Sequence, residues 1–523
     1  MAKSWTGIVG AVFVVAGAAA GYWCFSFEAN SLPPVEMPPL PQAPEEAGEE
    51  SVRQFCGTSC HGYPPPDSFP RSAWRKEVEQ GYYLAGRFRP DLHGPPLESV
   101  LAHYENRAPL VLKMPPRDPA VADRPPVQWR RRAHAKPGGE SFPQIVNVNV
   151  ARLWKDGSNQ IVICECDPLK NEGRVFSFDP RTSPPTWKEL ARLPVPVHTE
   201  IVDLDGDGRL DILVACLGRF FPSDDRTGSV VWLRGRDDGS FEAVTLLRDV
   251  GRVADVQTAD FNGDGKPDLV VAEFGWRAIG SVLLLENRTE DWSQPRFERR
   301  LLDDRHGALN VPVADLNGDG KPDFVALFSQ EHETVVAFLN DGGGEFHKKT
   351  IFSAPHPAYG SSGMQLVDLD ADGDLDVLYT NGDVLDKPFL LKPYHGVHWL
   401  ENRGAYPFAP HRLANMPGVM RAVAADLRGV GRPDIFAVSY LPVEEFPGRD
   451  SLDLDSVLWL EQSAPGQYRH RPLETRSCDH FTCTVGDLNG DGRLSLVVGN
   501  FWSSRQRPLK DALGLWTPPK PFK

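Results

Sequence analysis

The sequence predicts a mainly β fold, a seven-bladed β-propeller, from three observations. A short loop of the form Asp-x-Asp/Asn-x-Asp-Gly-x-x-Asp, or a degenerate copy of it, occurs seven times between Arg152 and Ser495. The copies start at residues 152, 203, 260, 315, 368, 426 and 487. Spacings of roughly 50–60 residues suit four strands with their loops. An apolar, β-rich run such as ILVAC follows each loop, which is typical of a buried strand.

The loop composition predicts sites for a hard cation such as Ca²⁺. Ca²⁺ takes six or more oxygen ligands, and alternate residues of a tight loop can direct carboxylates at one centre. In the copy at 203–211 the expected ligands are Asp203, Asp205, Asp207, the carbonyl of Arg209, and Asp211. The equivalent residues elsewhere are Asp260, Asn262, Asp264 and Asp268; Asp315, Asn317, Asp319 and Asp323; Asp368, Asp370, Asp372 and Asp376; and Asp487, Asn489 and Asp491.

Three copies depart from this pattern. Arg428 and Val430 replace central ligands in the copy at 426–434, so we expect that loop to be empty. Ser495 replaces the last carboxylate of the seventh copy and should weaken it. The first copy keeps only Asp156 and Gly157. A solvated acidic turn or an EF-hand could explain one isolated loop, but no copy has the Glu at position twelve that an EF-hand needs.

The loops resemble the FG-GAP/VCBS repeats of integrin-like seven-bladed β-propellers, over roughly residues 140–505. The resemblance implies that each loop joins the first and second strands of a blade and binds Ca²⁺. The formal charge of −15 disfavours a nucleic-acid partner. Residues 506–523 are left as a C-terminal tail.

The amino terminus predicts export. The uncharged run Gly7–Phe25 is long enough to span a bilayer, and Lys3 precedes it. We therefore expect residues 1–27 to be a single-pass anchor in the cell membrane, with the bulk of the chain outside the cytoplasm. Secretion after cleavage of a signal peptide is the alternative. Residues 28–50 are rich in Pro and Glu and predict an extended linker.

A second motif lies in residues 51–135, where Cys56, Cys60 and His61 form C-x-x-x-C-H. This segment is similar to small helical cytochrome-c-like segments, although the usual spacing is C-x-x-C-H. The resemblance implies covalently bound haem c, with Met114 as the first choice of second axial ligand and His93 or His103 behind it. A Cys56–Cys60 disulfide in an oxidising compartment, or free thiols, are the alternatives.

Polar residues also flank the strands at the end opposite the loops. They are His198, Asp255, His306, Asn310, Ser361, Ser362, Arg421, Asp479 and His480 before the loops, and Glu165, Glu273, Trp276, 329–333, Asn381, Asp383, Asn500 and Trp502 after the strands. A propeller mouth is solvated and polar in any case. The sharper interpretation is a ligand pocket, for instance for carbohydrate.

Two functions remain open from the sequence. The first is an exported binding or scaffold module that recognises a glycan or a protein, with haem-linked electron transfer. The second is a metal-assisted carbohydrate-active enzyme, a lyase or dehydratase, that uses Glu331, His332, Glu333 and His480. The sequence contains no G-x-S-x-G, Walker or H-E-x-x-H motif. Neither the ligand nor the oligomeric state can be derived from it.

Overall fold

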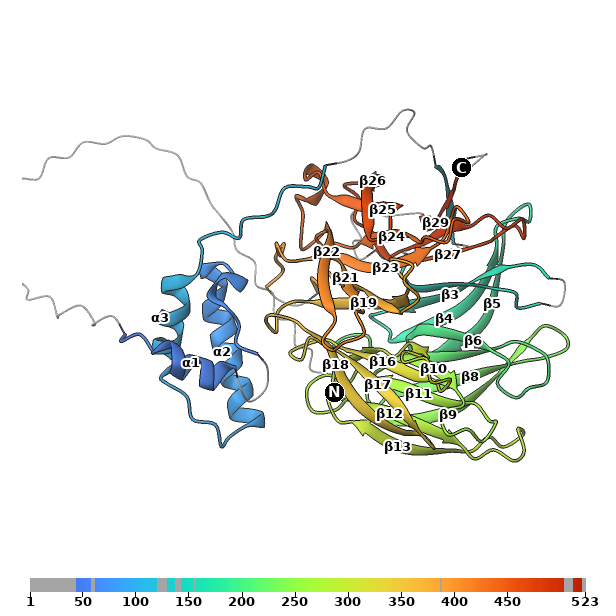
Figure 1. Cartoon of the computed structure of the whole chain (residues 1–523), viewed down its shortest axis with the longest axis horizontal. Helices are drawn as coiled ribbons and strands as arrows, with labels where there is room; N and C mark the ends of the chain where they lie inside the picture. The colour runs from blue at the N-terminus through green and yellow to red at the C-terminus, as the bar shows by residue number, and fades with distance from the viewer. Residues whose placement is uncertain are drawn as a thin grey trace, which may run out of the picture. The chain divides into compact units, whose positions relative to one another are not determined.

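Seven β-sheets of similar topology make up most of the chain (Figure 1). The computed structural model describes residues 44–57, 62–119, 129–136, 143–154, 157–385, 388–502 and 511–519. The expected anchor at 1–27, and with it Cys60, His61 and Asp156, lie outside these residues. We number the sheets as blades 1 to 7 in chain order.

Blades 1 to 3 each contain four consecutive strands. Blade 1 consists of β2 (Ile145–Ala151), β3 (Gln160–Asp167), β4 (Glu172–Asp179) and β5 (Thr186–Leu193). Blade 2 consists of β6 (Pro196–Val202), β7 (Asp211–Cys216), β8 (Gly228–Gly235) and β9 (Phe241–Val250). Blade 3 consists of β10 (Val253–Ala259), β11 (Asp268–Glu273), β12 (Ser281–Asn287) and β13 (Phe297–Asp303).

In blade 4 the first strand is interrupted. Its strands are β14 (Ala308–Asn310), β15 (Val313–Ala314), β16 (Asp323–Phe328), β17 (Thr334–Gly342) and β18 (Glu345–Ser353). Both β14 and β15 pair with β16. Pro312 lies between them and has no N–H to donate to the ladder, which accounts for the interruption.

Blades 5 and 6 return to the regular order. Blade 5 consists of β19 (Ser361–Val367), β20 (Asp376–Asn381), β21 (Gly396–Glu401) and β22 (Ala409–Asn415). Blade 6 consists of β23 (Val419–Ala425), β24 (Asp434–Ser439), β25 (Asp455–Ala464) and β26 (Gln467–Thr475), with a short 3-10 turn η2 (Arg449–Ser451) before β25.

Blade 7 is built from both ends of the propeller. It consists of β27 (His480–Gly486), β28 (Ser495–Asn500), β29 (Asp511–Thr517) and β1 (Arg130–Ala135). β1 pairs antiparallel with β29, for example Arg131 with Trp516, and becomes the outer strand. The propeller strands thus extend to both sides of residues 140–505, which carry the repeats.

The first strands of neighbouring blades contact one another all the way round, from β2 through β6, β10, β14, β19, β23 and β27 back to β2. The seven-bladed propeller predicted from the repeats is therefore confirmed. Each acidic loop lies between the first and second strands of its blade, as the resemblance implies. The apolar runs after the loops form the second strands, and all six residues of β7, β11, β16, β20, β24 and β28 are buried.

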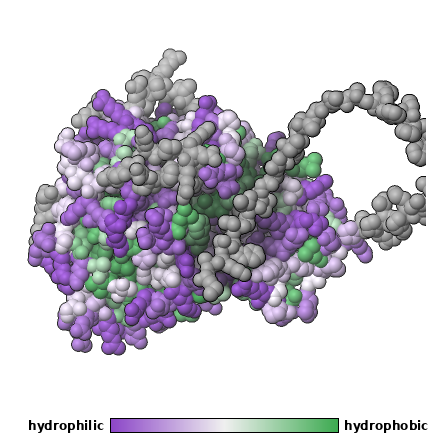
Figure 2. Space-filling view, turned by 180° about the vertical axis from the view of Figure 1, so that it is seen from behind, coloured by the Kyte–Doolittle hydropathy of each residue, from purple (hydrophilic) through white to green (hydrophobic). Residues whose placement is uncertain are grey.

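The segment before the propeller contains the helices α1 (Glu49–Cys56), α2 (Arg71–Phe88) and α3 (Leu97–Arg107), with the 3-10 turn η1 (Pro66–Ser68). Val52, Trp74 and Tyr104 are central to its apolar core. Trp74 and Tyr104 stack with their ring centroids 3.8 Å apart. Within the described residues, no helix is both long and apolar enough to cross a membrane. The face of the molecule in Figure 2 is mainly hydrophilic, with smaller hydrophobic areas.

Candidate metal-binding loops and polar pockets

The first aspartate of each acidic loop organises the turn. The Asp260 carboxylate accepts hydrogen bonds from the backbone N–H groups of Gly263, Asp264 and Gly265 at 2.8, 3.1 and 2.9 Å. Gly263 and Gly265 have φ values of 77° and 83°, which a residue with a Cβ adopts only with strain. Asp203, Asp315, Asp368 and Asp487 accept similar bonds in their loops.

The last aspartate has a structural role that the sequence analysis missed. Asp211 accepts one N–H bond from Leu204 in the loop at 3.1 Å and one from Gly235 at the end of β8 at 2.7 Å. Asp268, Asp323 and Asp376 repeat both bonds in their own blades. Burial raises the pKa of Asp268 and Asp376 to about 6 despite these bonds. This carboxylate therefore ties the loop to the third strand, whether or not it also binds an ion.

Two loops gather their carboxylates into groups that could hold a metal ion such as Ca²⁺. These groups are Asp203 with Asp205 and Asp211, and Asp368 with Asp370 and Asp376; in each, the oxygens lie within 4.8 Å of one another. The loops at 260, 315 and 487 have Asn at the third position, which offers an amide oxygen instead.

The Asp group at 368–376 is more available for metal binding than the group at 203–211. Asp205 already forms an ion pair with Arg234 at 2.5 Å. Oδ2 of Asp205 and Oδ1 of Asp370 are both buried without a hydrogen-bond partner, but among the described residues Asp370 has no ion pair of this kind. Ion pairs between the fifth and seventh loop positions also occupy Asp207 with Arg209, Asp319 with Lys321 and Asp491 with Arg493. At 368–376 the seventh position is Asp374, which cannot form such a pair.

The sixth loop contains its own positive charge. Nη2 of Arg428 donates to Oδ1 of Asp434 at 2.9 Å and to the carbonyl oxygen of Gln462 at 2.7 Å. Glu461 lies 3.8 Å from the same guanidinium group. The Arg428 side chain thus neutralises carboxylates that metal ligation would otherwise neutralise, which is a physical reason to expect this loop to be empty.

Several polar residues at the opposite face stabilise the fold. Glu273, at the end of β11, accepts the N–H of Gly251 at 2.5 Å and the hydroxyl of Ser281. Asn381, at the equivalent end of β20, accepts the N–H of Gly396 at 2.9 Å. The bonds from Ser281 and Gly396 join the second strand to the start of the third, and the bond from Gly251 holds the connection between blades 2 and 3. The polarity of Glu273 and Asn381 in the sequence therefore has a structural explanation.

Glu331 and His332 lie together with His306, which comes from the connection between β13 and β14. Nε2 of His306 is 2.9 Å from Oε1 of Glu331, and the two imidazole centroids are 4.8 Å apart. Burial opposes ionisation of Glu331, but its close pairing with His306 outweighs this effect and lowers the pKa of Glu331 to about 2. Burial, reinforced by His306, lowers the pKa of His332 to about 4.

The other two catalytic candidates have different partners. The buried Glu333 carboxylate accepts backbone N–H bonds from Gly360 and Ser361 at 3.1 and 2.9 Å. His480 bonds to Glu474 at 2.9 Å and to Asn500 at 2.7 Å. Among the described residues, the four candidates do not form a group with clustered metal-ligating atoms.

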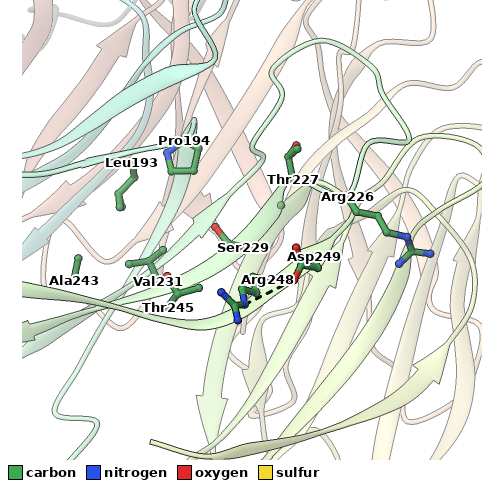
Figure 3. Close-up of a pocket in the computed structure, with 11 residues that line it drawn as sticks. Leu193, Pro194, Arg226, Thr227, Ser229, Val231, Ala243, Thr245, Arg248 and Asp249 are labelled. Atoms are coloured by element: carbon green, nitrogen blue, oxygen red, sulfur yellow. Dashed lines mark ion pairs between the residues drawn. The ribbon is translucent and has the colours of Figure 1, made fainter. Parts of the chain in front are cut away.

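A groove that was not predicted from the sequence lies between blades 1 and 2 (Figure 3). The groove has a volume of about 300 Å³. Leu193 and Pro194 line it from the blade 1 side, and Val231 and Thr245 come from the paired strands β8 and β9. Arg248 forms a 3.7 Å ion pair with Asp249 beside it. A pocket between blades depends on residues far apart in the chain, so no local sequence signal marks it.

Comparison with known proteins agrees with the repeat assignment. Residues 203–271 and 315–379 match the family model of the FG-GAP-like repeat. The chain carries FG-GAP-like repeats. No curated protein matches it. Similar solved structures include the Vibrio cholerae biofilm matrix protein Bap1, with 12% identity, 76% of this chain and 92% of that chain covered, and a TM-score of 0.37. Another is Saccharomyces cerevisiae Sqt1, with 9% identity, 76% and 99% covered, and a TM-score of 0.40.

The His306–Glu331 pair predicts a pH-dependent contribution to stability. The folded-state pKa of Glu331, about 2, lies below its ordinary value of 4.5. The contribution is therefore complete above pH 4.5 and is lost as the pH falls toward 2. Glu331→Gln should lower the free energy of unfolding by about 1–3 kcal/mol at pH 6 and by less than half as much at pH 3. Urea unfolding at both pH values measures this difference.

The exposed Glu345, which pairs with Arg300, provides the control. Glu345→Gln should change stability little at either pH, since exposed ion pairs contribute little. Equal destabilisation by Glu331→Gln at pH 6 and pH 3 would contradict the assignment.

Proposed function

We propose that this protein is a Ca²⁺-stabilised β-propeller that acts as a binding or scaffold module outside the cytoplasm. The observation that carries the proposal is the pair of Asp groups at the same place in blades 2 and 5. The FG-GAP-like repeats and the propeller fold support a binding module, because such a fold presents many loops on a rigid ring.

Electrostatic repulsion favours ion binding in these loops. Two carboxylates about 4 Å apart repel each other by roughly 4 kcal/mol at an effective dielectric constant of 20. Burial and the neighbouring carboxylates of Asp372 and Asp368 raise the pKa of Asp370. A bound Ca²⁺ would relieve this repulsion and complete the shell with backbone carbonyls and water. The proposal extends to the loops at 260, 315 and 487, with Ser495 weakening the last.

Export forms part of the proposal. Ca²⁺ sites of extracellular modules bind in the range of about 10⁻⁴–10⁻³ M, which suits exposed surface loops. The apolar run at 7–25 would act as the anchor or as a cleaved signal. The ligand of the module would be a glycan or a protein.

Haem-linked electron transfer is left out of the proposed function. Of Cys56, Cys60 and His61, the structure describes only Cys56. Burial raises the pKa of the Cys56 thiol to about 11, and its side chain packs against the apolar core that contains Tyr104. Tyr104 stacks on Trp74 within the same core, so the described packing beside this thiol does not fit a porphyrin. The enzyme alternative is also left out, because its four candidate residues do not form one site.

Removal of Ca²⁺ should destabilise the propeller. At 100 times the dissociation constant, each site contributes roughly 2.7 kcal/mol. We expect verified chelation to lower the melting temperature by at least ~5 °C, measured by calorimetry. Asp370→Ala, which removes the side-chain oxygens altogether, should reduce the bound Ca²⁺ by about one ion per chain without lowering the metal-free melting temperature.

Asp374→Ala is the matched control in the same loop, because its exposed carboxylate is not an expected ligand. It should keep the full Ca²⁺ content. An unchanged melting temperature after complete metal removal would refute the proposal.

The sixth loop offers a gain-of-site test. Arg428→Asp combined with Val430→Asp restores the acidic pattern around Asp426 and Asp434 and removes the internal cation. We expect about one additional Ca²⁺ per chain by native mass spectrometry, together with a larger stabilisation by Ca²⁺. The control Arg428→Ala with Val430→Ala should gain no ion and should be less stable, because it leaves buried Asp434 without its charged partner. No additional ion in the Asp variant would argue against ligation by this loop geometry.

A further inference from the structure

We propose that a polar cavity between blades 6 and 7 binds one neutral, polyhydroxylated unit, such as a single sugar ring. The cavity has a volume of about 240 Å³ and is lined by Arg131, Glu474, Ser477, Asp479, His480 and Asn500. Cavities for drug-sized ligands span roughly 300–1,000 Å³, so this one suits a smaller molecule. The inference rests on the proposed role as a binding module and names the ligand class of one site.

Every residue that lines the cavity is polar. His480, Asn500 and Asp479 are only 2%, 1% and 6% exposed. Buried polar groups are normally placed against partners, because leaving them unsatisfied is costly. Here the partners are other protein groups, with His480 held by Glu474 and Asn500, and Asp479 by Arg449, so the polar wall of the cavity is preorganised. It provides both hydrogen-bond donors and acceptors at short range.

The charges of the wall compensate one another. Glu474 lies 2.9 Å from Nε2 of His480 and 3.3 Å from Nε of Arg131. Asp479 forms an ion pair with the buried Arg449. An ionic ligand of either sign would therefore meet repulsion as well as attraction. A hydroxyl group both donates and accepts hydrogen bonds, so a neutral polyol can use guanidinium and carboxylate groups together.

The backbone holds Ser477 at the edge of this cluster. Arg476 and Cys478, on either side of it, have φ values of 76° and 46°, which residues with a Cβ rarely adopt. In this conformation the Ser477 hydroxyl donates to Glu474 at 2.5 Å and lies 3.4 Å from Nε2 of His480. The strained backbone conformation of Arg476 and Cys478 thus positions the Ser477 hydroxyl at the cavity.

A comparison with blade 5 shows which contacts at this cavity also occur as structural contacts elsewhere in the propeller. There the strand-end residue Asn381 bonds to His398 at 2.9 Å, much as Asn500 bonds to His480 in blade 7. The Asn–His pair therefore also occurs as a fold-stabilising contact. Arg131 and Ser477 line the cavity between blades 6 and 7 and are not part of this Asn–His pair. Substitutions at these two residues therefore test the proposed site.

The test uses the full chain and a panel of D-glucose, D-galactose, D-mannose and L-rhamnose in saturation-transfer difference NMR. The methyl glycosides and disaccharides of the same sugars form a second arm. We expect at least one sugar to bind, with an affinity at least tenfold weaker in Arg131→Gln and Ser477→Ala. The second arm distinguishes two sources of the sugar ring. If the cavity binds the end of a glycan chain, the methyl glycoside should bind as well as the free monosaccharide; if it binds only a free monosaccharide, the glycoside should bind more weakly.

Arg132→Gln is the matched control, because Arg132 is the next residue on β1 and does not line the cavity. It should bind like the unchanged protein, and the melting temperatures of all variants establish that they are folded. Absence of binding to every sugar, or binding that Arg131→Gln and Ser477→Ala leave unchanged, would overturn the inference. So would displacement of the sugar by millimolar phosphate. Each of these results leaves the Ca²⁺ dependence of melting untouched, so failure here is distinct from failure of the proposed function.

Discussion

The blades with complete acidic loops depend on the buried carboxylate at the last position of the loop. In blades 2 to 5 it accepts one N–H from the loop and one from the third strand. One side chain thereby fixes the turn between the first two strands and the register of the third. An unsatisfied buried N–H costs about 1–3 kcal/mol of stability. Loss of this carboxylate would leave two backbone N–H groups, one in the loop and one in the third strand, without their acceptor. In blade 6, whose loop lacks the central ligands, Asp434 keeps the bond to the third strand, since it accepts the N–H of Gln462 at 2.8 Å.

The proposed ion binding would be a second function of the loops, added to their structural role. Among the ligand positions of the loops in blades 2 to 6, the third, fifth and seventh vary. Side chains at the third and seventh can also bond to the third strand, as Arg428 does to Gln462 and Arg209 to Gly235. Arg428 shows how far this variation can go, since a guanidinium at the third position bonds to the same carboxylate that ends the loop. A basic residue at the seventh position, as in Lys321, neutralises part of the loop charge without a metal. The loops therefore form a graded series, in which 368–376 has the most uncompensated charge.

The propeller fold could be predicted from the sequence because the motifs that indicate it are local and are repeated in each blade. The loop pattern and the apolar run after it predicted the first turn and the buried second strand of every blade. The outer strand β1 gave no such signal, because RRRAHA is short, exposed and far from β29 in the chain. His306 was named only as one polar mouth residue, since its contact with Glu331 joins two connections that only the fold brings together. The polarity of Glu273 and Asn381 was visible, but their bonds to the third strand were not.

Closure of the ring by β1 links the fold to the cavity between blades 6 and 7. Arg131 lies on this closing strand, where its guanidinium is 5.3 Å from the Trp516 ring and pairs with Glu474 of the preceding blade. A strand that only covered the edge of β29 would not need a charged contact to blade 6. Because the same side chain lines the cavity, the wall of that site is complete only when the propeller is closed. Occupation of the cavity should therefore stabilise the closed ring, since any ligand that binds only the closed state favours it by mass action.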